Sequence, residues 1–188
     1  MKNENHSVTI FNARTIGVFF LLAFVAYGLG SHLYESTNNP EKYLGAILII
    51  ANSVMVMFIG ILFRKTLRLY NPTVSNIYLF TRIFESLSLS TILLNVGVSN
   101  DLGYILAMLV LGIGSMPMCL TLYKHKIAPS WLAIWGVIGY AVFAFGYLME
   151  LFGKEWGMYF LGLGGLWEVI FAIWLLVRGS KKVKTTTP

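Results

Sequence analysis

The chain has 188 residues, of which 57% are hydrophobic and only 12% are charged, against roughly a quarter charged in ordinary soluble domains. With so few ionisable groups the chain could not cover a water-facing surface, which excludes a soluble globular protein. The length predicts a single domain spanning 1–188. The net charge of +6 falls at the ends of apolar runs rather than on one soluble face, so we expect no nucleic-acid partner.

Apolar runs of membrane-spanning length follow one another along the chain. A bilayer core of about 30 Å needs about 20 helical residues. Six runs reach or approach that length: 15–34, 43–63, 73–98, 102–123, 127–149 and 156–177. A closed β-barrel also spans lipid, but its strands alternate in polarity, whereas these runs are continuously apolar. The sequence therefore predicts an all-α bundle of six transmembrane helices, with 1–13 and 180–188 as tails.

The first run has features of both a membrane helix and a secretory leader. It follows Arg14, and Gly28-Leu29-Gly30 resembles a small-residue cleavage site. Its length suits a spanning helix, and we expect it to stay in the protein.

The distribution of lysine and arginine predicts an orientation. Eleven of the fourteen lie in the N-terminal segment, the second and fourth loops and the C-terminal tail, whereas the opposite loops hold only Lys42 and Lys154. Cytoplasmic loops are enriched in lysine and arginine. We therefore expect both termini in the cytoplasm, with the basic tail near anionic lipid headgroups.

Charged side chains inside the third and sixth runs are the most informative residues. At the helical rise per residue, Arg82 lies about 14 Å and Glu85 about 18 Å from the start of the third run. Glu168 lies about 14 Å from the end of the sixth run, at the same side of the membrane. Charges at this depth are costly, so they pair, face the bundle interior or line a cavity.

Uncharged polar residues from three other runs are expected near that depth. They are Asn52, Ser115 and Tyr140. Because Arg82 and Glu85 share a helix face at a spacing of three residues, we predict an interior cluster with Arg82 between Glu85 and Glu168. Asn52 is expected nearby.

The predicted cluster has two interpretations. One arginine cannot neutralise two carboxylates, so the remainder must be protonated, hydrated, or matched by a bound cation or substrate. Buried ion pairs also fix helix register in bundles, which makes structural glue the competing interpretation. Membrane-buried charges are functional hypotheses by default, and both interpretations stay open.

Two further patterns bear on packing and symmetry. Pro117 lies inside the fourth run and is expected to kink it near 112–115, either for packing or as a hinge or cavity lining. Glu85 and Glu168 each lie twelve residues after the start of their run, as an inverted repeat would require. The two halves do not align beyond that coincidence.

Catalytic and metal motifs are weak in this sequence. His6, His32 and His125 lie at run ends or in loops, so no bis-His haem or His-rich metal site is expected. Cys119 has no second cysteine to pair with. Gly-Ile-Gly-Ser at 112–115 resembles a serine nucleophile, but no later run carries a histidine base. We expect no catalytic residue, metal or cofactor, and enzymatic activity is disfavoured.

Several short motifs together resemble a known family. They are Arg14-Thr15-Ile16-Gly17, Thr81-Arg82-Ile83-Phe84-Glu85, Gly114-Ser115-Met116-Pro117, Pro129-Ser130-Trp131-Leu132-Ala133 and Trp167-Glu168. Across nearly the whole chain the sequence resembles the bacterial membrane-protein family catalogued as domain of unknown function 4386. The resemblance implies a compact multi-pass bundle in a bacterial cytoplasmic membrane, with charge at the positions of Arg82, Glu85 and Glu168. It implies nothing firm about activity.

Two functional classes follow from these observations. The first is a carrier or channel for a small or amphipathic solute, with or without proton coupling, that uses the predicted cluster. The second is a non-transporting membrane protein that binds a lipid or a protein partner, with the cluster as internal glue. The substrate, the coupling ion and the oligomeric state stay open.

Overall fold

The computed structural model describes the backbone of residues 2–94 and 100–178 and the side chains of 13–93 and 102–177. The described residues form six α-helices and one short 3₁₀ helix. They are α1 (Lys2–Tyr34), α2 (Asn39–Leu67), α3 (Pro72–Ser90), η1 (Thr91–Leu94), α4 (Asn100–Lys124), α5 (Ser130–Leu151) and α6 (Gly157–Arg178).

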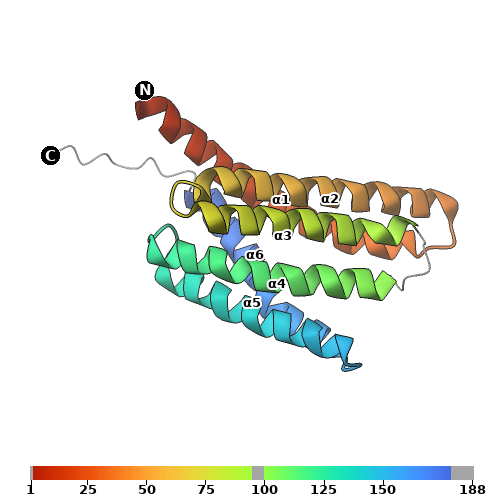
Figure 1. Cartoon of the computed structure of the whole chain (residues 1–188). Helices are drawn as coiled ribbons and strands as arrows, with labels where there is room; N and C mark the ends of the chain where they lie inside the picture. Colours follow the sequence, from red (N-terminus) through yellow and green to blue (C-terminus); the bar gives the residue numbers. More distant parts are fainter. Residues whose placement is uncertain (1, 95–99, 179–188) are drawn as a thin grey trace.

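The helices form a closed up-and-down ring. Each α-helix packs against its neighbours in the chain, and α6 closes the ring by packing against α1. In Figure 1, α2, α3 and α4 run side by side along the bundle, while α6 crosses behind α4 at an angle. This arrangement leaves one face of every helix pointing to a common interior.

Five helices are long and apolar enough to cross a membrane: α1, α2, α4, α5 and α6. The exception is α3, whose 19 residues include Arg82, Glu85 and several serines. The α-helix ends at Ser90, and the chain continues as the 3₁₀ helix η1 to Leu94. The apolar run 73–98 is therefore longer than α3. The last residues of that run, 95–98, lie outside the described residues. The helix α1, by contrast, begins at Lys2, well before the apolar run that starts at residue 15.

The polarity of α3 is reversed relative to a helix of a soluble protein. Its buried residues include Ser75, Tyr78, Arg82 and Glu85, while large apolar side chains point outward, with Leu87 65% exposed. A water-soluble helix buries its apolar stripe and exposes its polar one. The reversal indicates that α3 faces an apolar surrounding on its outside and polar partners on its inside.

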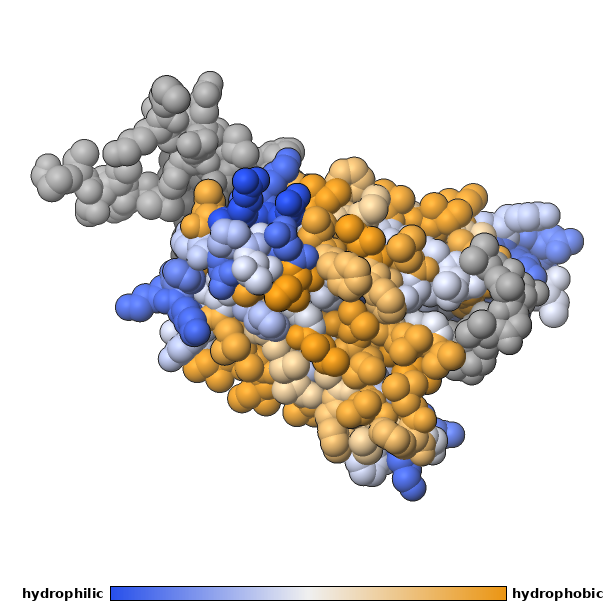
Figure 2. Space-filling view, in the orientation of Figure 1, coloured by the Kyte–Doolittle hydropathy of each residue, from blue (hydrophilic) through white to orange (hydrophobic). Residues whose placement is uncertain are grey.

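The molecular surface shows the same pattern. Hydrophobic side chains cover the middle of the bundle, and hydrophilic side chains gather toward its ends (Figure 2). We call the end that carries the α2–α3 and α4–α5 connections the basic end; its charged residues include Arg64, Lys65, Arg68, Lys124 and Lys126. The opposite end is called the acidic end; it carries Glu35, Glu41, Glu150 and Glu155, together with Lys42 and Lys154. The chain is thus a helical multi-pass bundle of the membrane type.

Two glycines let α2 and α4 approach α3 closely. A Cβ added to Gly60 of α2 would lie 2.8 Å from Arg82 Cβ. A Cβ added to Gly114 of α4 would collide with the side chain of Thr81. Small residues at helix contacts are a general device for close packing in membranes, and here they hold α3 at a fixed depth in the ring.

Candidate functional site

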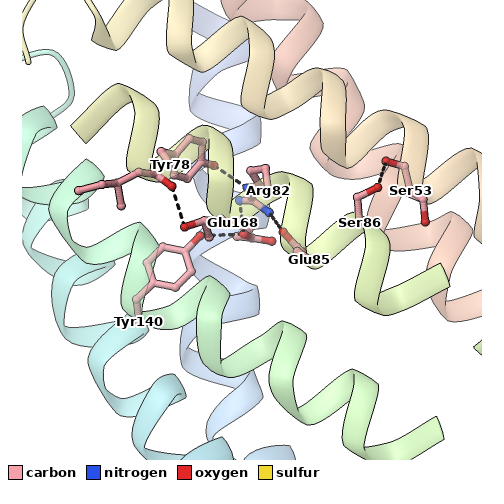
Figure 3. Close-up of polar contacts among 9 residues, drawn as sticks. Ser53, Tyr78, Arg82, Glu85, Ser86, Tyr140 and Glu168 are labelled. Carbon is pink, nitrogen blue, oxygen red and sulfur yellow. Dashed lines mark hydrogen bonds and ion pairs between the residues drawn. The ribbon is translucent and has the colours of Figure 1, made fainter. Parts of the chain in front are cut away.

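Arg82 is the centre of a buried network of charged side chains, drawn in Figure 3. Its Nε donates a hydrogen bond of 2.8 Å to the hydroxyl of Tyr78, one turn earlier on α3. Its two terminal nitrogens form ion pairs of 2.8 Å, one with Glu85 Oε2 and the other with Glu168 Oε1 on α6. The side chains of Arg82 and Glu85 are only 2% and 6% exposed, and that of Glu168 is 17% exposed.

Aromatic side chains complete this network. The hydroxyl of Tyr140 on α5 donates a 2.7 Å hydrogen bond to Glu168 Oε1. The guanidinium of Arg82 also lies over the ring of Phe20 on α1, with Cζ 5.0 Å from the ring centroid. An aromatic ring within about 6 Å attracts a cation through its quadrupole. Four helices therefore contribute to one cluster, which we call the Arg82 cluster: Phe20, Tyr78, Arg82, Glu85, Tyr140 and Glu168.

Glu168 on α6 is positioned by Trp167, its neighbour in the chain. Trp167 is fully buried, and its indole nitrogen donates a 2.6 Å hydrogen bond to the carbonyl of Leu132 on α5. Its ring also stacks on Phe171, with the centroids 4.7 Å apart. Because this anchor fixes the rotation of α6, Glu168 is directed into the ring of helices.

The charges of the Arg82 cluster do not balance when all its groups are ionised. Arg82 supplies one positive charge, and Glu85 and Glu168 supply two negative ones. Among the described residues, donors reach only Oε2 of Glu85 and Oε1 of Glu168. The other oxygen of each carboxylate is thus available to a proton, a cation or a ligand.

A central cavity of about 290 Å³ lies against the Arg82 cluster. All six α-helices contribute to its wall, and the polar lining residues include Asn52, Arg82, Glu85, Tyr140 and Glu168. Much of the remaining wall is aromatic: Phe20, Phe24, Tyr27, Tyr104 and Phe143. Small-molecule sites combine an apolar wall with a few convergent polar groups in this way.

The central cavity reaches the side of the bundle between α1 and α6. Phe24 lines the cavity and is at the same time 53% exposed. Gly28 of α1 and Gly165 of α6 line the same stretch, and a Cβ added to Gly28 would meet no atom within 4 Å. We call this stretch the α1–α6 seam: Phe24, Gly28, Leu161 and Gly165.

A layer of tyrosines separates the central cavity from a second one at the acidic end. The ring of Tyr104 stacks on Tyr27 at 5.9 Å and meets Tyr147 edge-on at 5.8 Å. Tyr104 lines both the central cavity and a second, more open cavity of about 440 Å³ that Glu150, Lys154 and Glu155 also line. The hydroxyls of Tyr147 and Tyr104 are 3.4 Å apart, a long hydrogen bond. We call Tyr27, Tyr104 and Tyr147 the tyrosine layer.

The residues singled out in the sequence lie in three different situations. The structure brings Arg82, Glu85, Glu168 and Tyr140 into direct contact, as described above. Asn52 lines the central cavity and is 2% exposed, and its amide nitrogen finds no hydrogen-bond partner among the described residues.

Ser115 does not join the cluster, although the sequence placed it at a similar depth. It is fully buried on α4, it does not line the central cavity, and its hydroxyl has no hydrogen-bond partner in the described part of the chain. Nearby, α4 continues through Pro117 as a single α-helix from Asn100 to Lys124, and the Pro117 carbonyl accepts a 2.9 Å hydrogen bond from Thr121 Oγ1.

The sequence reasoning missed two members of the cluster. Tyr78 stands four residues before Arg82, a spacing that places both on one helix face, so periodicity alone could have indicated it. No comparable signal exists for Phe20, because a phenylalanine in an apolar run is indistinguishable from lipid-facing or core residues. In the described part of the chain, no three His, Cys, Asp or Glu side chains are grouped so that they could hold a metal ion.

A scan against protein families matches residues 97–179 to the family model described as a domain of unknown function, DUF4386. This part of the chain resembles that domain family. The match includes α4, α5 and α6, and hence Tyr140 and Glu168, but it does not include Arg82 or Glu85. Searches of curated proteins and of solved structures found no match to the chain.

Proposed function

We propose that this chain is a small membrane carrier that crosses the bilayer six times, with both termini in the cytoplasm. In this proposal the Arg82 cluster binds both the solute and a coupled proton inside the membrane. The observation that carries it is the central cavity, which is lined by all six α-helices and bounded by two carboxylates that share one arginine. Ionisable side chains inside a membrane protein typically mark solute pathways and proton relays.

Two features support six spans and this orientation. The helix α3 has apolar side chains on its outer face and packs between α2 and α4, so its polar residues are shielded from lipid. The basic end carries most of the lysines and arginines of the connections, which is the bias of cytoplasmic loops. The apolar helices support a membrane location, and the proposal places the chain in a bacterial inner membrane.

The two cavities suggest a path for the solute. In the proposal, the second cavity opens to the outside at the acidic end, and the tyrosine layer closes the central cavity from it. Ring contacts of this kind contribute about 0.5–1.5 kcal/mol each, so the layer can open at a modest cost in free energy. The Arg82 cluster closes the cavity toward the basic end.

One observation favours the second candidate, a non-transporting protein in which the cluster is structural glue. Arg82 directs three hydrogen bonds of 2.8 Å at Tyr78, Glu85 and Glu168, and thereby ties α3 to α6. A test must therefore respond to proton or ion movement rather than to stability alone.

The test is a rapid pH jump on proteoliposomes adsorbed to a solid-supported membrane, with no solute added. We expect a transient displacement current in the wild type, because a proton binds at the spare carboxylate from the cavity. The Glu168→Gln and Glu85→Gln variants should lose most of that current, and Glu35→Gln, an exposed residue near the acidic end, should keep it. A wild type without current, or equal currents in all variants, would contradict the carrier and favour the glue.

A further inference from the structure

The central cavity also indicates which class of solute it accepts, an inference that rests on the proposed function. We propose that it binds a weakly hydrated organic cation of the alkylammonium or arylammonium type. Its positive nitrogen lies beside the free carboxylate oxygens of Glu85 and Glu168, and its apolar part contacts the aromatic wall.

The first argument is the sign of the available charge. Every nitrogen of the Arg82 guanidinium donates to Tyr78, Glu85 or Glu168, and the side chain is only 2% exposed. Because two carboxylates already surround the guanidinium and screen its charge, an anion would meet net repulsion at this site. The two carboxylates each keep one oxygen that no described residue binds, and Glu168 is the most exposed of the three charged side chains. With both carboxylates ionised, the cluster as a whole has an excess of negative charge, which a bound cation would balance.

The second argument is the wall of the central cavity. It contains several aromatic rings, and aromatic faces attract cations that have given up their water. The fold already uses this attraction for Arg82, which lies over the rings of Phe20 and Tyr78 at 5.0 and 5.1 Å. A strongly hydrated ion such as Na⁺ would lose its water against a mostly apolar wall, whereas a quaternary ammonium group has little water to lose.

The third argument concerns size and access. The cavity volume of about 290 Å³ is at the lower limit of small-molecule sites, which measure about 300–1,000 Å³. It therefore holds one small organic ion. Because the cavity reaches the side of the bundle at the α1–α6 seam, a single alkyl substituent can extend from the cavity toward the lipid.

The experiment measures binding to the full-length protein in nanodiscs by isothermal titration calorimetry. The probes are benzyltrimethylammonium, its uncharged isostere neopentylbenzene, and benzenesulfonate. We expect the cation to bind about tenfold or more tightly than either other probe, since it alone complements the spare carboxylates. The Glu168→Gln variant should bind the cation about tenfold or more weakly and should bind the uncharged isostere as the wild type does. Glu35→Gln is the matched control and should bind the cation like the wild type.

A comparison within the wild type keeps this test valid if Glu168→Gln does not fold. Equal binding of benzyltrimethylammonium and neopentylbenzene, or tighter binding of benzenesulfonate, would overturn the proposal. Failure of the cation proposal can be distinguished from failure of the carrier proposal. A pH-jump current without cation binding would overturn only the solute class, whereas cation binding without a current would support the site and contradict the proposed proton-coupled carrier.

The seam is tested with a pair of cations that differ in length. Gly165→Leu places a large side chain at the seam beside Phe24, while Gly162→Leu, where an added Cβ meets nothing within 4 Å, is the control. We expect Gly165→Leu to weaken the binding of hexyltrimethylammonium severalfold and to leave the binding of tetramethylammonium unchanged. Equal effects on the two ions, or no effect on either, would overturn the lateral opening.

Discussion

The Arg82 cluster and the tyrosine layer face the same cavity from opposite directions, but different forces hold them. The cluster is made of ion pairs and hydrogen bonds between 2.7 and 2.8 Å. The tyrosine layer is made of ring contacts near 6 Å and a single long hydroxyl contact of 3.4 Å. The first is directional and buried, and the second is adaptable and lies near the acidic end.

This difference teaches which part of the bundle can move. Breaking a buried ion pair leaves an uncompensated charge and costs about 3–5 kcal/mol, whereas a contact between two aromatic rings contributes about 0.5–1.5 kcal/mol beyond the area that it buries. Opening at the tyrosine layer is therefore far cheaper than opening at the Arg82 cluster.

Arg82→Met should give the largest loss of stability. It leaves Glu85 and Glu168 buried without their common cation, so we expect a cost of about 3–5 kcal/mol, measured by unfolding in detergent. Arg64→Met is the control, because the side chain of Arg64 bonds to Asn76 in an exposed position at the basic end, and its cost should stay below about 1 kcal/mol.

The same experiment has a rescue arm. Adding Glu85→Gln and Glu168→Gln to Arg82→Met removes the stranded charges and should recover most of the lost stability. Equal costs for Arg82→Met and Arg64→Met would mean that the cluster contributes no more than a surface contact.

Gly114→Ala should have the next largest effect. The added Cβ collides with Thr81 and forces α4 away from α3, which we expect to cost about 1–3 kcal/mol. Gly162→Ala is the matched control, since the space around Gly162 is open, and it should be neutral or slightly stabilising. If both variants unfold at the same denaturant concentration, close packing of α3 and α4 does not hold the cluster.

Tyr104→Ala should act on access more than on stability. It removes two ring contacts, each worth about 0.5–1.5 kcal/mol beyond the area that they bury, and joins the two cavities. In a background with Cys119→Ala and Asn52→Cys, a small charged thiol reagent added at the acidic end should label the new cysteine faster. Tyr104→Phe keeps the rings and should label like the parent. Equal labelling of the Ala and Phe variants would show that the layer is not the barrier.

Ser86→Ala should give the smallest effect. Its hydroxyl donates a 2.8 Å hydrogen bond to the Ser53 carbonyl and joins α3 to α2 (Figure 3). Such bonds within membranes average about 0.6 kcal/mol, so we expect a loss of that order in an unfolding titration. Ser88→Ala, on the same helix, should be neutral. A larger loss of stability for Ser88→Ala than for Ser86→Ala would contradict the role assigned to the Ser86 hydrogen bond.

Hydrophobic runs predicted the all-helical fold because a spanning helix needs a long apolar segment. Helix ends were harder to predict, since a helix can continue into polar sequence or stop within an apolar run. The helix α1 begins at Lys2, in a segment predicted as a tail, and α3 ends at Ser90, inside an apolar run. Hydropathy reports the surroundings of a residue, whereas local hydrogen bonding and packing decide where a helix stops.

The contact of Arg82 with Glu85 and Glu168 was predicted from the sequence, but the direction of other polar side chains was not. A rise per residue gives the level of a side chain, and its direction depends on how its helix packs. Ser115 illustrates this limit: it was expected at the level of the charged residues, but it lies outside the central cavity. The rotation of α6 is fixed by Trp167 and its bond to Leu132, a long-range contact that no local pattern in the sequence encodes.

The most direct test of the account is chemical labelling of its two carboxylates. Dicyclohexylcarbodiimide partitions into membranes and reacts with protonated carboxyl groups to form a stable N-acylurea that mass spectrometry locates. We predict an adduct on Glu168, the more exposed of the pair, and protection by benzyltrimethylammonium. Failure to label either Glu168 or Glu85 at any pH, with Glu35 reacting normally with a water-soluble carbodiimide, would contradict a carboxylate site that is open to the central cavity.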